Sequence, residues 1–269
     1  MKHILLLILI IICPTVVMAQ HVEPGTFDAK RNIAGTYNFW LYTPAEYKTD
    51  KHPLPVIIFL HGASLCGNNL ARVRRYGPLD AIEKGKIINT FVLAPQNPGG
   101  AWNPKKVLAM LEWVEKNYAV DTTRVYVFGM SLGGYGTLDF TATYPEKVAA
   151  AMALCGGASK SDLSGLGKVP LWIMHGTADR AVSIQQSKRV VSYLQGHHLD
   201  SLLRYDWGKG YNHAIYARFF YLQKVYDWLV AHSTKDNPRE VDRNFSITDS
   251  DIRSTYQDLK RLPHMFDND

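Results

Sequence analysis

The chain has 269 residues, of which 46% are hydrophobic and 20% are charged, a balance typical of a globular protein and not of a disordered one. The formal net charge is +6, but the basic residues are scattered and form no stripe, so nucleic acid is not an expected partner. Only three cysteines are present, too few for a disulfide framework.

The first feature in chain order is a secretory signal peptide, predicted over residues 1–19. Lys2 gives a positive start and residues 4–12 form an apolar run. The run is shorter than the roughly 20 residues that a spanning helix needs, and Pro14 interrupts it. We therefore expect cleavage, no stable membrane span, and export to the periplasm or the extracellular space. A membrane anchor, or lipid attachment at Cys13, remains the alternative.

Short runs of apolar and β-branched residues follow, with helical patterns between most of them. Runs that are almost entirely apolar are typical of strands buried on both faces. The alternation predicts a mostly parallel sheet with helices on both faces, an α/β fold, in one domain over residues 20–232. The predicted strands are residues 37–42, 56–60, 91–94, 125–129, 149–155, 171–175 and 202–205, and the predicted helices are residues 103–118, 132–144, 184–194 and 215–230.

Two connecting segments complete the predicted organisation. The link from the strand at 149–155 to the strand at 171–175 has only about 15 residues, so we expect an open active site with no sizeable lid domain. Residues 233–269 form a polar tail in which one short helix is predicted after Ser250. We expect this tail to be an appendage and not a second domain.

A G-x-S-x-G pattern occupies residues 129–133, directly after an apolar strand and before a helical pattern. The glycines are needed because the serine lies on a strained strand-to-helix turn, where larger side chains would collide with the crossing backbone. Such a turn would present the hydroxyl of Ser131 as a nucleophile. Because a hydroxyl is a poor nucleophile at neutral pH, the pattern requires an acid and a histidine base later in the chain.

Asp179 and His213 fit that requirement in the expected order. Each follows a predicted strand, which places both at the sheet edge where ligands bind in open α/β folds. We predict that His213 takes the proton of Ser131 and that Asp179 orients the histidine. Taken singly, the aspartate could be a helix cap and the histidine an exposed loop residue. Asp206 is the rival acid.

A His-Gly pattern ends the strand predicted at residues 56–60, where chains with this serine motif form an oxyanion hole. We predict that the backbone N–H groups of Ala63 and Leu132 are its donors. His61 is expected to hold this loop in shape through hydrogen bonds, with a catalytic role as the alternative.

Other side chains near these motifs are candidate substrate contacts. Trp102 could stack on an aromatic acyl group or a sugar, or simply pack in the core. Arg72, Arg74 and Arg75 could meet an anionic substrate or form a solvated helix face. No metal or organic cofactor is implied, because the histidines show no ligand spacing.

These motifs resemble the α/β-hydrolase superfamily and, within it, exported bacterial esterases and predicted peptidases related to feruloyl esterases and polyhydroxyalkanoate depolymerases. The resemblance covers about residues 54–230 and implies the α/β-hydrolase fold with the same roles for the residues named above. It also implies an ester substrate, such as acetyl or feruloyl groups on polymeric plant carbohydrate. A dienelactone hydrolase is disfavoured because its nucleophile is a cysteine.

The resemblance leaves several alternatives open. The secreted depolymerases carry several cysteine pairs, whereas only Cys66 and Cys155 follow the signal here, which disfavours a polyester substrate. Whether these two cysteines form a disulfide stays open. A serine peptidase on the same fold, or a binding protein that kept the fold without catalysis, remains an alternative to the esterase.

Overall fold

The computed structural model describes residues 25–257 and 259–261. The signal peptide predicted at residues 1–19, with Cys13, lies outside the described residues. Within the part of the chain that is described, no helix is both long and apolar enough to cross a membrane.

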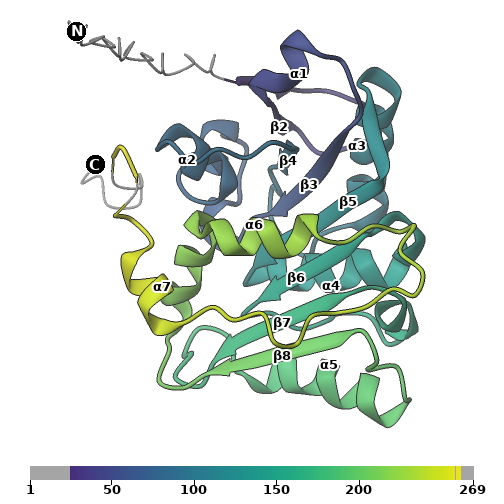
Figure 1. The fold of residues 1–269 in the computed structure, drawn as a ribbon, viewed down its shortest axis with the longest axis vertical. Coiled ribbons are helices and arrows are strands. Elements are labelled where there is room, and N and C mark those ends of the chain that lie inside the picture. Colours follow the sequence, from purple (N-terminus) through teal and green to yellow (C-terminus); the bar gives the residue numbers. More distant parts are fainter. Residues whose placement is uncertain (1–24, 258, 262–269) are drawn as a thin grey trace, which may run out of the picture.

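The strands form an eight-stranded sheet at the centre of the molecule (Figure 1). They are β1 (Thr26–Lys30), β2 (Phe39–Thr43), β3 (Leu54–Leu60), β4 (Phe91–Pro95), β5 (Val120–Met130), β6 (Ala150–Leu154), β7 (Leu171–Gly176) and β8 (Leu203–Gly208). Their order in the sheet is β1-β2-β4-β3-β5-β6-β7-β8. Strands β3 to β8 are parallel, and β2 is antiparallel to both of its neighbours. The predicted mostly parallel α/β fold is confirmed.

The helices alternate with these strands along most of the chain. The α-helices are α1 (Ala45–Thr49), α2 (Pro78–Glu83), α3 (Pro104–Asn117), α4 (Leu132–Thr143), α5 (Gln185–Gly196), α6 (Gln223–Val230) and α7 (Asp249–Ser254). The 3-10 helices are η1 (Ala63–Leu65), η2 (Leu70–Arg74), η3 (Pro145–Lys147), η4 (Ser164–Lys168) and η5 (His213–Tyr221).

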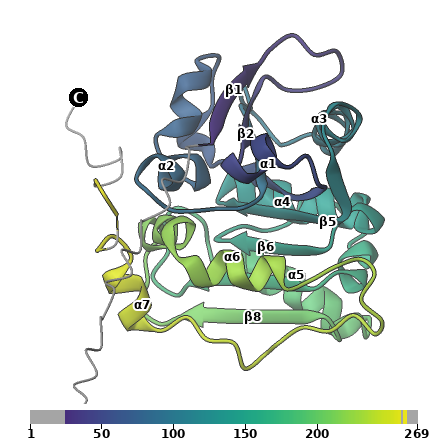
Figure 2. The same cartoon turned by 45° about the horizontal axis from the view of Figure 1, so that its top comes forward.

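Each face of the sheet has its own hydrophobic cluster, covered by its own helices (Figures 1 and 2). Along β3, Ile57 and Phe59 belong to one cluster, whereas Val56 and Ile58 belong to the other. This is the alternation that a strand imposes on successive side chains. The first cluster includes residues of α2, η5 and α6, and the second includes residues of α3, α4 and α5.

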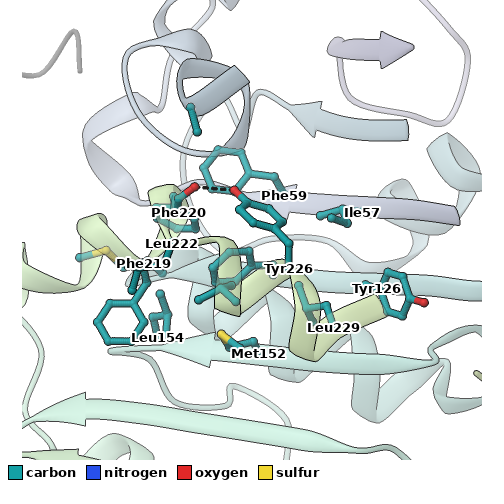
Figure 3. Packing of buried hydrophobic residues seen from close by; sticks show 14 of the residues in the cluster. Ile57, Phe59, Tyr126, Met152, Leu154, Phe219, Phe220, Leu222, Tyr226 and Leu229 are labelled. Atoms are coloured by element: carbon teal, nitrogen blue, oxygen red, sulfur yellow. Dashed lines mark hydrogen bonds between the residues drawn. The ribbon is translucent and has the colours of Figure 1, made fainter. Parts of the chain in front are cut away.

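The first cluster anchors the segment that begins at His213. Figure 3 shows Phe220 of η5 among Phe59 and Tyr226, with a hydrogen bond of 2.5 Å from the Tyr226 hydroxyl to the Phe220 carbonyl oxygen. The ring centroid of Phe220 lies 5.0 Å from that of Phe59 and 4.6 Å from that of Phe128. Because such aromatic contacts bury large apolar areas, they anchor the carboxyl-terminal part of η5 in the core.

The seven predicted strands coincide with β2 to β8, and three predicted helices coincide with α3, α4 and α5. Strand β1 was not predicted, because its residues are exposed or half-buried and contain no apolar run. The helix predicted over residues 215–230 is wrong in its continuity. The extended backbone of Leu222 separates η5 from α6, after three consecutive aromatic residues, which have lower helix propensity.

The described part of the polar tail packs along the domain and includes α7 (Figure 1). The Arg239 guanidinium donates hydrogen bonds to the carbonyl oxygens of Lys168 at 2.6 Å and Val148 at 2.9 Å. Val241 and Ile252 are buried in the first cluster. Within the described residues, the tail therefore packs on the domain and contributes Val241 and Ile252 to its core.

Candidate active site

Ser131 lies on the turn between β5 and α4, with a φ of 60° and a ψ of −123°. A positive φ is uncommon for a residue with a side chain and marks a strained turn. A Cβ atom at Gly133 would lie 1.7 Å from the Leu60 carbonyl oxygen, and one at Gly129 would lie 2.4 Å from the Gly133 carbonyl oxygen. No side chain fits at either position, which is the steric reason for the G-x-S-x-G pattern.

Asp179 and His213 meet after β7 and β8. His213 Nδ1 lies 2.6 Å from Asp179 Oδ2, and the other carboxylate oxygen accepts the N–H groups of Ala181 and Val182, each at 2.9 Å. Burial favours a higher pKa for Asp179, but the hydrogen bonds from Val182 and His213 outweigh it and hold the pKa below its ordinary value. The carboxylate is therefore charged where it faces the imidazole, whose side chain is 22% exposed.

The rival acid Asp206 is engaged elsewhere. Its Oδ2 atom accepts hydrogen bonds from Trp172 Nε1 at 2.6 Å and Arg204 Nε at 3.0 Å. Among the described residues, no hydrogen bond joins Ser131 Oγ to His213. Such contacts are often long in free enzymes and shorten when substrate binds.

His175 is a second histidine on the same carboxylate, and its role was missed in the sequence. Its Nε2 atom lies 3.2 Å from Asp179 Oδ2, and its Nδ1 atom lies 2.7 Å from Ser187 Oγ. Ser187 in turn donates to the Gly156 carbonyl oxygen at 2.6 Å. Burial lowers the pKa of His175. The four-residue spacing from histidine to aspartate, across the turn after β7, was the signal that could have revealed this contact.

One group of the described residues offers metal-ligand atoms close together. The ligand atoms of Cys155, His175 and Asp179 lie within 4.8 Å of one another. Burial raises the pKa of the Cys155 thiol, and the Asp179 carboxylate already accepts the N–H groups of Ala181 and Val182 and contacts His213. A metal ion here would compete with His213 for the Asp179 carboxylate. These side chains therefore fit the role of orienting Asp179 better than that of binding a metal. Cys66 and Cys155 are free thiols in this structure.

Two backbone N–H groups stand next to Ser131 at the starts of helices. Ala63 is the first residue of η1, and Leu132 is the first residue of α4. First-turn N–H groups have no partner within their own helix, and neither of these two donates a hydrogen bond to another described residue. A Cβ atom at Gly62 would lie 3.4 Å from Ser131 Cβ, so the η1 turn directly adjoins the serine.

His61 supports this turn from inside the core. Its Nε2 atom accepts the Asn97 N–H at 3.0 Å, so the proton is on Nδ1, which donates to the Gly62 carbonyl oxygen at 2.7 Å. Burial lowers the pKa of His61 to about 4. The ring is therefore neutral at neutral pH and makes the structural hydrogen bonds expected of it.

Trp102 packs behind His61 and is only 4% exposed. Its ring lies 5.0 Å from that of His61 in an edge-to-face contact, and its Nε1 atom donates to the His61 carbonyl oxygen at 3.3 Å. A ring so enclosed has no free face for a substrate. Its burial favours the core-packing alternative over the predicted substrate contact.

The arginines after the oxyanion turn bind the protein itself. Arg72 donates to the carbonyl oxygens of Ser64 at 2.7 Å and Cys66 at 3.1 Å. Arg74 pairs with Glu83 and lies over the ring of Trp40. Arg72 is nevertheless exposed on η2, as expected for a solvated helix face, whereas Arg74 is only partly exposed.

The solved structures that this chain resembles have the α/β-hydrolase fold, and the chain has the same fold. Residues 107–206, which reach from α3 into β8, match the model of a family described as putative esterases. A crystal structure of a thermostable esterase is 25% identical, with a TM-score of 0.61, over 79% of this chain and 64% of that one.

Two curated relatives are acetylxylan esterases. A bifunctional acetylxylan esterase/xylanase of Neocallimastix patriciarum is 33% identical over 166 residues, 59% of this chain and 24% of that protein. A probable acetylxylan esterase A of Aspergillus clavatus is 29% identical over 89 residues, 33% of this chain and 29% of that protein. The chain thus matches less than a third of the length of either relative.

Proposed function

We propose that this protein is a serine hydrolase that cleaves carboxylic esters, with Ser131 as nucleophile, His213 as base and Asp179 as the group that orients the base. The observation that carries the proposal is the 2.6 Å contact between Asp179 and His213 at the sheet edge where the strained turn presents Ser131. The esterase family match supports the same chemistry.

The reaction follows from these positions. His213 Nε2 accepts the proton of Ser131 Oγ as that oxygen attacks the ester carbonyl carbon, while Asp179 stabilises the imidazolium. The N–H groups of Ala63 and Leu132 donate to the tetrahedral oxyanion. The imidazolium then protonates the leaving alcohol, and a water molecule deprotonated by His213 releases the acid from the acyl-enzyme.

Acetyl esters of plant polysaccharide are the proposed substrates. The two curated relatives carry acetylxylan esterase in their names. The link between β6 and β7 contains only the short helix η4, so no lid domain stands there to exclude a bulky polymer. A feruloyl group has less support, since Trp102 is enclosed in the core. Export through the predicted signal peptide would bring the protein to such a polymer.

The first test compares the hydrolysis of p-nitrophenyl acetate, methyl ferulate and acetylated xylan by the mature protein. We expect both acetyl substrates to be cleaved and Ser131→Ala to lower kcat by at least about 1,000-fold. Fluorophosphonate labelling of the wild type, and not of Ser131→Ala, would identify the nucleophile independently.

The outcomes separate the alternatives. Cleavage of peptides faster than esters would favour a serine peptidase. Absence of both labelling and ester hydrolysis would contradict the proposal and favour a binding protein with a hydrolase fold. Faster turnover of methyl ferulate than of the acetate would overturn the acetyl preference alone.

A further inference from the structure

In the turn that carries Ala63, every carbonyl oxygen from residue 62 to residue 66 accepts a hydrogen bond. Two of these bonds lie within the turn: the Leu65 N–H donates to Gly62 at 3.2 Å, and the Cys66 N–H donates to Ala63 at 3.1 Å. A short 3-10 turn with two internal bonds has little stability of its own. Side chains from outside the turn donate the other hydrogen bonds that stabilise it.

Arg72 and Gln96 bind the remaining three carbonyl groups from opposite sides. The guanidinium of Arg72, on the exposed side, bridges Ser64 at 2.7 Å and Cys66 at 3.1 Å. Gln96 is 4% exposed, and its Nε2 atom donates to Leu65 at 3.1 Å and to Asn69 at 2.8 Å. Its amide therefore also joins the η1 turn to the start of η2.

Peptide geometry converts these contacts into a direction for the Ala63 N–H. The carbonyl of Gly62 and the N–H of Ala63 belong to one planar trans peptide, so they point in opposite directions. The Nδ1 atom of His61 donates a hydrogen bond to the Gly62 carbonyl oxygen at 2.7 Å and so fixes its orientation. Arg72 and Gln96 hold the residues that follow, which prevents the peptide from rotating. The N–H group of this peptide, that of Ala63, donates no hydrogen bond to another described residue, and it is the proposed oxyanion donor.

Given the proposed esterase function, on which this inference rests, the geometry points to Arg72 and Gln96 as positioning residues that hold the η1 turn in the shape that directs the Ala63 N–H at the oxyanion. Donors that are already oriented need no reorganisation when charge develops on the substrate oxygen. The charge of Arg72 is also felt within the turn, since it opposes the rise that burial causes in the pKa of the Cys66 thiol.

The test uses Arg72→Gln and Arg72→Lys in the mature protein, with Arg31→Gln as the control. Arg31 is an exposed arginine between β1 and β2, far along the chain from the turn. We expect Arg72→Gln to lower kcat for p-nitrophenyl acetate about 10- to 100-fold, with KM changed less than about 3-fold. The kcat of Arg72→Lys should lie between those of Arg72→Gln and the wild type. An ammonium group keeps the charge but lacks the planar guanidinium that bridges two carbonyl groups.

Two further measurements distinguish positioning from a general loss of structure. The inhibition constant of benzeneboronic acid, which forms a tetrahedral adduct on a nucleophilic serine, should rise in parallel with the fall in kcat. Amide hydrogen exchange should quicken across residues 61–67 and stay unchanged in α5. Gln96→Leu, which removes the inner contact, should quicken exchange in the same segment.

Some outcomes would overturn the inference without touching the proposed function. These are an unchanged kcat in both Arg72 variants, or a rise in KM confined to anionic esters, which would make Arg72 a substrate contact. Unchanged exchange in the turn would also overturn it. If the wild type cleaves no ester, the proposed function fails instead, and the exchange measurement still shows whether Arg72 holds the turn.

Discussion

His61 is fully buried beneath the oxyanion turn, with hydrogen bonds at both ring nitrogens. Desolvation lowers its pKa from 6.5 to about 4. The unfolded chain therefore binds the proton at a higher pH than the folded chain does. The stability linked to this group is fully present above about pH 6.5 and is lost as the pH falls toward 4. At the acid end of this window the loss is about 3 kcal/mol.

Replacing His61 by glutamine tests this linkage. We expect His61→Gln to be less stable than the wild type at neutral pH, because the hydrogen bonds to Gly62 and Asn97 are remade imperfectly. We also expect the difference between the two proteins to shrink as the pH falls from about 6.5 to about 4. Urea unfolding at several pH values measures both effects. Curves that stay parallel over this window would show that His61 does not titrate there.

At the scale of elements, the close approach of α4 to β3 depends on glycine. The first turn of α4 lies so near the end of β3 that a methyl group at Gly133 would overlap the Leu60 carbonyl oxygen. That approach also brings Leu132 and Ser131 beside the η1 turn. The same residue thus permits both the packing of helix on sheet and the assembly of the site.

Alanine at this position should therefore disrupt the site. We expect Gly133→Ala to destabilise the fold by about 3 kcal/mol or more and to abolish fluorophosphonate labelling. Gly196 of α5 is the matched control, since a Cβ atom there meets nothing within 4 Å. We expect Gly196→Ala to be neutral or to stabilise by up to about 1 kcal/mol. Thermal unfolding of the two variants makes the comparison, and equal effects would argue against the steric account.

Some elements of this structure have a sequence pattern from which they can be predicted, and others do not. Buried strands and the serine turn could be predicted, because apolar runs and obligatory glycines record their steric environment directly. Strand β1 could not, because an edge strand with mixed exposure needs no apolar pattern. The contacts of Arg72 left no signal either, since its partners are backbone carbonyls, which every residue possesses. The catalytic roles of Ser131, Asp179 and His213 remain predictions.

At the scale of the whole molecule, the polar tail joins parts of the sheet that are distant in sequence. Arg239 donates hydrogen bonds to carbonyl groups just before β6 and just before β7. These lie at the amino-terminal ends of the strands, whereas Ser131 follows the carboxyl-terminal end of β5. Arg204 of β8 donates to the Asp242 carbonyl oxygen at 2.9 Å. Val241 and Ile252 add buried apolar surface to the first cluster. The domain therefore extends beyond α6.

Removing the tail after position 232 should lower the stability of the domain while leaving the site residues in place. Exposing the surfaces against Val241 and Ile252 should cost about 3 to 6 kcal/mol, and Tm should fall by about 10 °C or more. Arg239→Gln should give a smaller decrease, because the tail can still bury its apolar residues. Scanning calorimetry measures both variants. A truncated protein with an unchanged Tm would mean that the tail contacts contribute nothing to stability.

The position of Arg239 late in the chain also affects the order in which the molecule can be completed during synthesis. The carbonyl groups of Val148 and Lys168 leave the ribosome long before the arginine that binds them. Domains begin to fold from their amino-terminal side while translation continues. These two hydrogen bonds can therefore form only after residue 239 has emerged. A nascent chain stalled before this point would therefore lack the contacts that Arg239 makes before β6 and β7.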